Sequence, residues 1–197
     1  MRFSPAHVRA FAVRCFVAAG VEPAHAQQIA DNLILADLRG VASHGVTRVP
    51  IYVERLQRGV VNPAPAMRVL RDTGPLMLVD GDNGSGAVVS NFANRLAIRA
   101  ARAWGLAAVS ARNSNHNGIN AAYTLETARA GMIGIAATNV AMSMATAGGR
   151  EPVLGTNPIS IAVPRRGGEP IVLDMATSVV ARGKVVEAAK RGEPIPL

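Results

Sequence analysis

The chain has 197 residues, of which 49% are hydrophobic and 17% charged, with a net charge of +8 and one cysteine. This composition excludes a disordered chain and a disulfide framework, and no apolar run reaches the roughly 18 residues of a membrane span. The basic residues are scattered rather than gathered in a run interleaved with aromatic side chains, so we expect no nucleic-acid partner and no membrane partner. Small carboxylate or phosphate ligands remain compatible with the charge.

The first predicted helix begins after Ser4, whose hydroxyl suits an N-cap, and Pro5 suits the first helical position. Gly20 predicts its end, because glycine readily adopts the conformation that terminates a helix. Part of the buried face of this helix is predicted to consist of Phe11, Cys15, Val17 and Ala18.

Two further helices and a rigid linker follow. Apolar residues recur at helical spacing in residues 23–38 and 47–58, and a glycine follows each segment. Their apolar stripes contain Ile29, Leu33 and Ala36 in the first helix and Val49, Val53 and Leu56 in the second. The Asn62–Pro65 segment, which carries two prolines, predicts a boundary. We therefore expect a helical N-terminal section over residues 1–63 and a second domain over residues 64–197.

Beyond the linker, short apolar segments with strand character alternate with amphipathic helices, which is typical of an α/β or α+β sheet domain. We predict strands over residues 67–70, 76–80, 106–111, 133–138, 159–163 and 171–173, and helices over residues 87–104, 118–130 and 178–190. We assign the chain to the α/β class, with a mixed sheet behind a helical N-terminal section.

The segment around Ser43 and His44 presents several ionisable groups to one region. His44 lies between two predicted helices, and Arg48 and Tyr52 are four residues apart on one helical face. A guanidinium binds a carboxylate in bidentate fashion, and an imidazole moves protons near neutral pH. The combination suits an acid whose neighbouring carbon carries an ionising OH or C=O. The alternative is that Ser43 caps the third helix and His44 is a solvated loop residue.

A second polar segment, Asn113–Gly118, contains His116 and lies after a predicted strand and before a predicted helix. Ligand pockets of sheet proteins form at such strand ends, and helix N-termini attract anions. A plain polar turn is the alternative. His7 and His25, in contrast, lie on amphipathic helices, and we interpret both as residues of the helix surface.

Two other chemical signatures are weak. Gly81, Gly84 and Gly86 lack the G-x-G-x-x-G spacing of a dinucleotide fingerprint, so we interpret them as turn glycines. The histidines are far apart in the sequence, Cys15 lies on a helix, and no cluster of carboxylates accompanies them, so the sequence does not support a metal site.

Several sequence blocks follow one another in a recognisable order. They are Asp37–Gly45 with Arg48, Pro50, Tyr52 and the Gly59–Pro63 tail, then Asn113–Gly118, Gly148–Pro152, Gly155–Pro158, and Asp174–Ser178 followed by Arg182–Lys184. Together they resemble the malate/L-lactate dehydrogenase family, over essentially the whole chain. The resemblance implies a non-Rossmann, mixed-sheet nicotinamide-binding domain in a cytoplasmic homodimer. It also implies hydride transfer between NAD(P)H and C2 of a small 2-oxo or 2-hydroxy acid, or of a cyclic 2-imino acid.

The resemblance further implies roles for individual residues. His44 matches the proton donor and acceptor, Ser43 would relay or orient it, and His116 matches either a catalytic base or part of the cofactor pocket. Substrate-binding roles fall on Arg48, Tyr52 and Thr156. Roles in binding NAD or NADP, between which the sequence does not choose, fall on Asn115, His116, Asn117, Gly118, Val140, Asp174, Met175 and Ala176.

The chain departs from the family pattern at Asn117, where members usually carry a bulky aromatic or apolar residue, and in its length. Family chains continue well past Leu197 into a second half with further strands and cofactor contacts. We therefore expect the C-terminal half of the family fold to be absent and apolar sheet surface to be uncovered. The alternative to an active oxidoreductase is a truncated, catalytically inactive fragment that only associates or dimerises.

Overall fold

The structure is a computed structural model that describes residues 3–178, 185, 188–189 and 191–194. The chain divides into two compact units, one up to Ile119 and one from Asn120 onward, and each has its own helices and its own sheet. Most of the predicted helix over residues 178–190, together with the Arg182–Lys184 block, lies outside the described residues. The boundary expected after residue 63 lies inside the first of these compact units and stays a prediction.

The first unit opens with α1 (Pro5–Ala18) and α2 (Pro23–Leu38), which pack against each other. Both helices agree with the sequence prediction. The Ser4 hydroxyl caps α1 by accepting a hydrogen bond from the His7 amide at 3.2 Å. Proline at the first helical position of each helix removes one of the first-turn amides that would otherwise lack an intrahelical partner.

The buried face of α1 differs from the predicted one. Ala12 and Phe16 are 1% and 0% exposed, whereas Phe11 and Val17 are 53% and 41% exposed. Of the other two predicted positions, Cys15 is partly buried and Ala18 is exposed. Because apolar residues lie all around this helix, the spacing alone does not indicate which stripe packs on α2. Among the members of the apolar stripes predicted for the next two helices, Val53 is partly buried. The other members are buried: Ile29, Leu33, Ala36, Val49 and Leu56.

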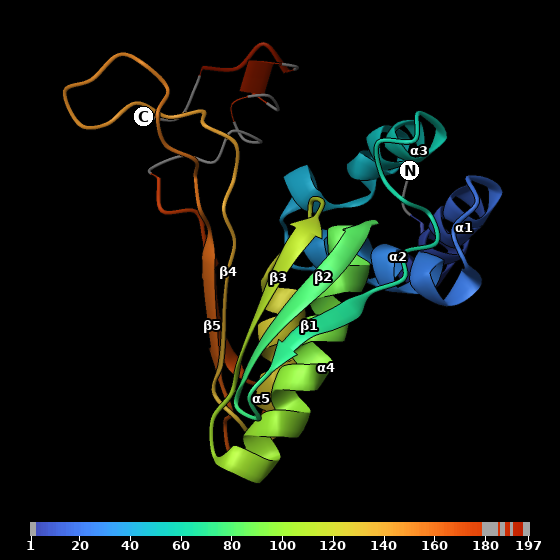
Figure 1. Ribbon diagram of the computed structural model, residues 1–197. Helices are drawn as coiled ribbons and strands as arrows, with labels where there is room; N and C mark the ends of the chain where they lie inside the picture. The colour runs from blue at the N-terminus through green and yellow to red at the C-terminus, as the bar shows by residue number, and fades with distance from the viewer. Residues whose placement is uncertain (1–2, 179–184, 186–187, 190, 195–197) are drawn as a thin grey trace. The chain divides into compact units, whose positions relative to one another are not determined.

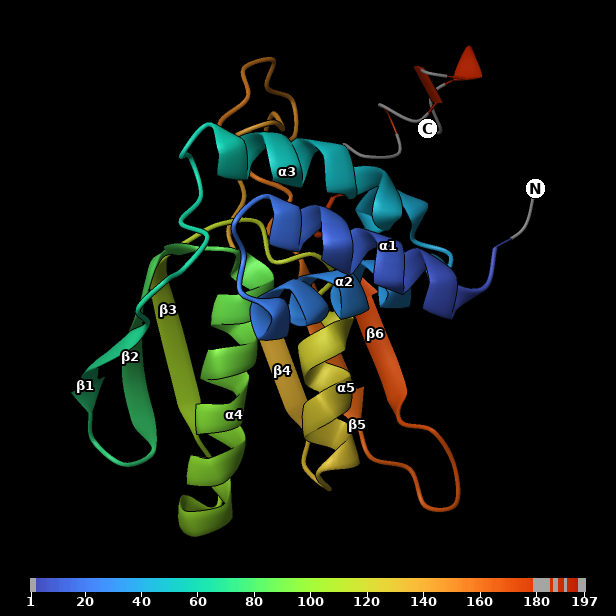
Figure 2. The same cartoon turned by 90° about the vertical axis from the view of Figure 1, so that its right-hand side faces the viewer.

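Two 3₁₀ turns, Ala42–His44 and Val46–Arg48, precede α3 (Val49–Gln57). They displace the start of α3 to Val49 instead of Thr47. Figure 2 shows α1, α2 and α3 gathered at the N-terminal end of α4 (Gly86–Trp104). The residues that precede α3 therefore lie close to the end of the sheet from which α4 departs.

The sheet of the first unit consists of β1 (Arg68–Asp72), β2 (Leu76–Gly84) and β3 (Ala108–Ser114), in that order. β1 pairs antiparallel with β2, β2 pairs parallel with β3, and α4 connects the parallel pair along one face (Figure 1). β2 is longer than predicted, because Asp82 and Asn83 adopt positive φ angles of 49° and 55° within a bulged strand end. The glycines interpreted as turn residues belong to this bulge and to the start of α4.

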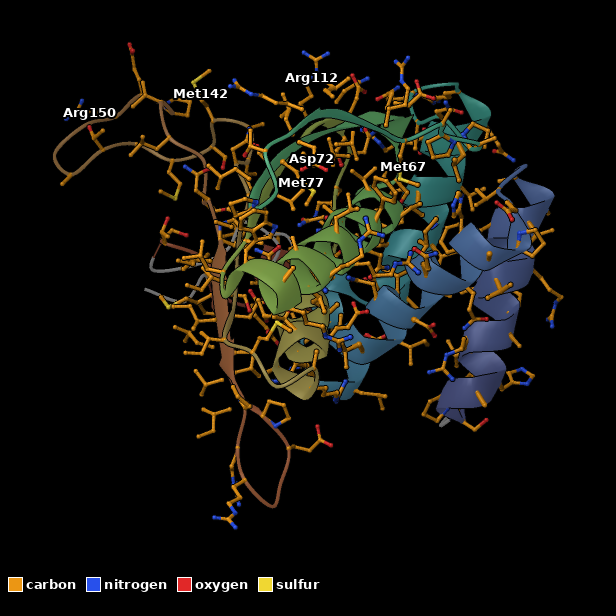
Figure 3. All side chains as sticks on the ribbon, turned by 60° about the horizontal axis from the view of Figure 1, so that its bottom comes forward. Met67, Asp72, Met77, Arg112, Met142 and Arg150 are labelled. Carbon is orange, nitrogen blue, oxygen red and sulfur yellow. The ribbon has the colours of Figure 1, made fainter. Side chains whose placement is uncertain are left out.

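The second unit consists of α5 (Ala121–Arg129) and a sheet of β4 (Gly134–Ala137), β5 (Ile159–Val163) and β6 (Ile171–Met175). The strands are antiparallel neighbours in the order β4-β5-β6, and α5 covers one face of the sheet (Figure 2). The β4–β5 connection is a long loop from which Met142 and Arg150 project (Figure 3). With two such units, the mixed α/β architecture predicted from the sequence is confirmed.

The two faces of the second sheet differ sharply. Beneath α5, the Thr124 and Ser160 hydroxyl oxygens lie 2.8 Å apart, and both residues are almost fully buried. On the opposite face, Ile135, Ile171 and Leu173 are 69%, 62% and 48% exposed. This face of the sheet is therefore apolar and exposed.

Candidate active site

Three segments of the first unit bring polar side chains together. The 3₁₀ turns supply Ser43, His44 and Arg48, α3 supplies Tyr52, and the loop after β3 supplies His116. The rings of His44 and His116 stack with their centroids 5.4 Å apart. Two histidines that are distant in the sequence are therefore neighbours in the fold.

The turn that carries His44 is fixed by the end of α2. The Asp37 carboxylate accepts a hydrogen bond from the Val46 amide at 2.9 Å. It also fills the space beside Gly45, where an added Cβ would lie 1.8 Å from a carboxylate oxygen. Only glycine fits this position without displacing Asp37. Asp37 belongs to the family block, but its role was not assigned from the sequence.

Ser43 organises both neighbouring side chains. Its hydroxyl oxygen lies 2.9 Å from Nδ1 of His44, and its carbonyl accepts a hydrogen bond from Nε of Arg48 at 2.7 Å. The Arg48 contact fixes the plane of the guanidinium through one edge. Its terminal nitrogens are then the donors that suit a carboxylate.

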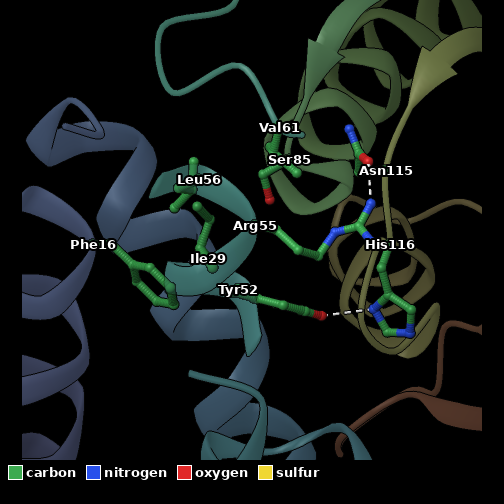
Figure 4. Close-up of a pocket in the computed structure, with 9 residues that line it drawn as sticks. All are labelled: Phe16, Ile29, Tyr52, Arg55, Leu56, Val61, Ser85, Asn115 and His116. Atoms are coloured by element: carbon green, nitrogen blue, oxygen red, sulfur yellow. Dashed lines mark hydrogen bonds between the residues drawn. The ribbon is translucent and has the colours of Figure 1, made fainter. Parts of the chain in front are cut away.

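His116 is held through a single ring nitrogen. Nδ1 lies 2.6 Å from the Tyr52 hydroxyl and accepts a hydrogen bond from the Gly118 amide at 3.2 Å. The close-up in Figure 4 shows the Tyr52 hydroxyl pointing at this nitrogen. Behind Tyr52 lies a cavity of about 30 Å³, with room for a water molecule or two but not for a nicotinamide ring. Its apolar lining is supplied by the buried side chains Phe16, Ile29, Leu56 and Val61.

The loop around His116 is anchored at Asn115. The Asn115 amide group donates to the carbonyls of Asn83 and Gly84 at 2.9 and 3.1 Å, and its carbonyl accepts a hydrogen bond from Arg55 at 3.0 Å. The backbone of this loop also lies against the start of α4. A Cβ added at Gly86 would lie 2.1 Å from the main-chain carbonyl oxygen of Asn115. The bulge in β2 thus positions the loop. Sequence reasoning missed Arg55, although it lies one helical turn beyond Tyr52.

Asn32 of α2 fastens the other end of the loop. It is 4% exposed, donates to the carbonyls of Asn117 and Ile119 at 3.2 and 3.3 Å, and accepts from the Ile119 amide at 3.1 Å. Gly118 has a φ of +72°, and a Cβ there would lie 1.8 Å from the Asn32 side-chain oxygen. A polar residue inside the apolar stripe of α2 was the sequence signal for this contact, and it was missed.

Burial and positive charge control the protonation of the cluster. Burial, followed by Arg48, lowers the pKa of His44 from its usual value of 6.5. Desolvation, followed by the charges of His44, Arg48 and Arg55, lowers the pKa of His116 to about 4. His116 as a whole residue is exposed to solvent, and the two arginines shift its pKa in the same direction as desolvation of the ring. Burial raises the pKa of Tyr52 to about 12, against the two arginines. At neutral pH both imidazoles are uncharged and the phenol keeps its proton.

The remaining candidate residues form a separate cluster in the second unit. The Val140 amide donates to the Asn157 side chain at 3.0 Å, and the Thr177 amide donates to the Thr156 carbonyl at 2.9 Å. A Cβ at Gly155 would lie 2.2 Å from the Val140 carbonyl oxygen, so the two loops meet backbone to backbone.

The end of β6 completes this second cluster. Asp174 pairs with Ser160 across the β5–β6 ladder, and its carboxylate accepts a hydrogen bond from the Ala121 amide at the start of α5, at 2.7 Å. Met175 is 49% exposed and Ala176 is partly buried. The structure therefore brings the second-unit candidates to one end of their sheet.

The chemistry of the second cluster fits a nicotinamide. Such a ring has a flat apolar face and a carboxamide, which call for apolar contacts and for backbone donors and acceptors. Val140, Met175 and Ala176 offer accessible apolar side chains beside main-chain amides and carbonyls. The close backbone approach at Gly155 keeps this surface free of a further side chain.

Other candidate groups do not join either cluster. His7 is exposed, as predicted, but His25 is largely buried and lies 3.8 Å from Glu22. Within the described part of the chain, no three His, Cys, Asp or Glu side chains are grouped so that they could hold a metal ion. In that same part, no helix is both long and apolar enough to cross a membrane.

Comparison with known proteins shows which family the chain resembles. A sequence profile described as malate/L-lactate dehydrogenase matches residues 3–197. The chain is 47% identical over 186 residues to malate dehydrogenase of Pyrococcus abyssi, covering 94% of this chain and 51% of that protein. It is 42% identical to L-sulfolactate dehydrogenase of Methanocaldococcus jannaschii, covering 90% and 51%.

A solved structure agrees with these matches. Malate dehydrogenase of Pyrococcus horikoshii superposes with a TM-score of 0.90 at 45% identity, covering 94% of this chain and 53% of that one. The chain thus spans about half the length of the relatives it matches. The order of the sequence blocks, the fold and these matches agree, and the chain belongs to the malate/L-lactate dehydrogenase family.

Proposed function

We propose that this chain takes part in hydride transfer between NAD(P)H and C2 of a small 2-oxo or 2-hydroxy acid, or of a cyclic 2-imino acid. When bound, the nicotinamide supplies the hydride donor or acceptor. The observation that carries the proposal is the stacking of His44 on His116 beside Arg48, which joins a proton-transfer group to a carboxylate clamp. Relatives named malate, sulfolactate and ureidoglycolate dehydrogenases favour a 2-hydroxy acid.

In this proposal Arg48 binds the substrate carboxylate and fixes the face that C2 presents. Ser43 orients His44, and one of the two histidines exchanges the proton on the C2 oxygen or nitrogen. Tyr52 lies beside the position that we propose for the substrate, and Thr156 would add a substrate contact. The Asn115–Gly118 loop, Val140 and the Asp174–Ala176 segment would hold the nicotinamide. We further propose a homodimer in the cytoplasm.

The test is oxidation of NADH and NADPH by the purified chain against a panel of 2-oxo acids and cyclic imines. We expect His44→Ala to lower turnover by about 10²–10⁴-fold, because general acid–base catalysis contributes that much. Arg48→Lys should raise KM for the acid, since lysine lacks the planar fork. His7→Ala, a histidine on the exposed surface of α1, is the matched control. An unchanged KM in Arg48→Lys would contradict the assigned clamp.

A second candidate is an inactive chain that only associates. The exposed apolar face of the β4–β5–β6 sheet favours it, because surfaces of this kind usually contact another protein surface. Binding of NADH, measured by fluorescence, separates the two candidates. Binding with turnover supports the oxidoreductase, whereas concentration-dependent association without binding supports the second candidate.

A further inference from the structure

The Gly118 amide determines which nitrogen of His116 can carry a proton. A backbone N–H is only a donor, so Nδ1, which accepts from it at 3.2 Å, must present its lone pair. The Tyr52 hydroxyl, 2.6 Å from the same nitrogen, is then also a donor. The neutral ring consequently carries its proton on Nε2. Protonation of Nδ1 would break the Gly118 contact and would require the Tyr52 hydroxyl to turn from donor to acceptor.

The buried side chain of Asn32 holds the Gly118 amide in place. Asn32 bonds to the backbone on both sides of Gly118, and its oxygen fills the space beside the glycine Cα. The direction of the Gly118 N–H is therefore set from α2, an element that contributes no side chain to the chemistry. This explains why a polar residue is buried in the apolar stripe of α2.

The positive charges around His116 favour its neutral ring, as the hydrogen bonds to Nδ1 do. The groups that face the ring are His44 and Arg48 from the 3₁₀ turns and Tyr52 and Arg55 from α3. His44 differs, because its Nδ1 meets the Ser43 hydroxyl, which can donate or accept. With Ser43 accepting from Nδ1–H, Nε2 of His44 is a base. With the ring protonated on both nitrogens, Nε2 is an acid.

We propose, on the basis of the hydride-transfer function above, that Tyr52 and Asn32 are positioning residues that keep His116 as a neutral Nε2–H donor, while His44 exchanges the proton. In the oxidative direction the C2–H bond breaks and its electron pair leaves with the hydrogen for the oxidised nicotinamide. The O–H electron pair forms the C2=O bond, and the proton moves to Nε2 of His44. Nε2–H of His116 donates to the C2 oxygen throughout and keeps its own proton.

The tautomer is tested directly by ¹⁵N chemical shifts of the imidazole nitrogens, without substrate or cofactor. The chain has four histidines, so substitution of each by Gln assigns the signals. We expect His116 to show an unprotonated Nδ1 and a protonated Nε2 between pH 6 and pH 9. In Tyr52→Phe the neutral form loses a hydrogen bond, so the midpoint of His116 titration should move to higher pH. A proton on Nδ1 in the unaltered chain would overturn the proposal.

Kinetics test the division of labour. His116→Gln keeps a neutral N–H donor, so we expect kcat within about tenfold of the unaltered chain and an unchanged acidic limb in the pH profile. His44→Gln should lose at least about 100-fold. Tyr52→Phe should lower kcat by up to about tenfold with little change in KM, and His7→Gln should change neither.

The outcomes separate this proposal from the function on which it rests. If His116→Gln is as inactive as His44→Gln, or removes the acidic limb, the assignment of the two histidines is overturned. If the unaltered chain turns over no acid or imine, the hydride-transfer function fails. The ¹⁵N signals then still decide the tautomer of His116.

Discussion

The two clusters of candidate residues are held in different ways. In the first unit, Asn32 and Tyr52 reach the His116 loop across 87 and 64 residues of sequence, through buried or half-buried side chains. In the second unit, Val140 and Thr156 are held mainly by main-chain contacts among loops at the end of a sheet. A proton-transferring group requires a fixed orientation, whereas a flat cofactor ring requires an accessible surface. The difference in construction matches the roles proposed for His44 and His116 in the first cluster, which orient a proton, and for Val140 and the Asp174–Ala176 segment in the second, which contact a flat ring.

Gly118→Ala should break the first cluster with the largest effect. The new Cβ would collide with the Asn32 side chain, and the φ of +72° disfavours alanine. We expect a loss of about 3 kcal/mol in the free energy of unfolding, from backbone strain and displaced hydrogen bonds, together with loss of turnover. Chemical denaturation measures the first effect and a steady-state assay the second.

Gly59→Ala is the matched control for this substitution. Gly59 has a similar φ of +68°, but no atom lies within 4 Å of an added Cβ. We expect only the backbone cost, about 1 kcal/mol. Equal losses in the two variants would mean that Asn32 yields easily and does not fix the His116 loop.

The sequence anticipated local structure better than long-range contacts. The bounds of α2 match their prediction because proline at its start and glycine beyond its end are local signals. The packed face of α1 was misassigned, since that choice depends on what α2 presents to it. Asn32, Asp37 and Arg55 went unassigned because their partners lie 87, 9 and 60 residues away.

The pairing of His44 with His116 illustrates the same limit. Each segment is identifiable as polar and ionisable, but 64 residues separate even Tyr52 from His116, and no periodicity connects them. Only the family resemblance placed both in one site before the fold was known. The β2 bulge that carries the Asn115 contacts was also missed, because Asp82 and Asn83 enter the left-handed region without a glycine at either position.

Ser160→Ala should sharpen the comparison by weakening the sheet beneath the second cluster. The Ser160 hydroxyl donates to the Leu173 carbonyl at 2.8 Å, so the Thr124 hydroxyl must be the donor in the pair between them. Removing the Ser160 hydroxyl takes one hydrogen-bond partner from each of the two groups, and we expect a loss of about 2 kcal/mol. Thr124→Val keeps the Ser160–Leu173 bond and should cost about 1 kcal/mol. Hydrogen exchange at the β5 and β6 amides measures both, and the reverse order would contradict the assigned donor directions.

The smallest expected effect is a dependence of stability on pH that originates in the first cluster. The pKa of His116 is lowered to about 4 in the folded chain, against an ordinary value of 6.5. Between these values the unfolded chain binds more protons, so the free energy of unfolding falls as the pH is lowered from about 6.5 toward 4. Above about pH 6.5 this contribution is fully present and constant. The lowered pKa of His44 acts in the same direction.

Urea denaturation at intervals between pH 7.5 and pH 4.5 measures this slope. His116→Gln should reduce it, because glutamine does not titrate, whereas His7→Gln on the exposed face of α1 should leave it unchanged. Asp80 does not contribute to the slope in this pH range. Hydrogen bonds from Asp82 and Asn113 lower its pKa below 3.8, so its contribution to the free energy of unfolding is lost only at more acid pH. An identical slope in His116→Gln and the unaltered chain would mean that His116 titrates normally in the folded state. The contrast between a fixed first cluster and an accessible second one would then lose its electrostatic support and rest on hydrogen-bond geometry alone.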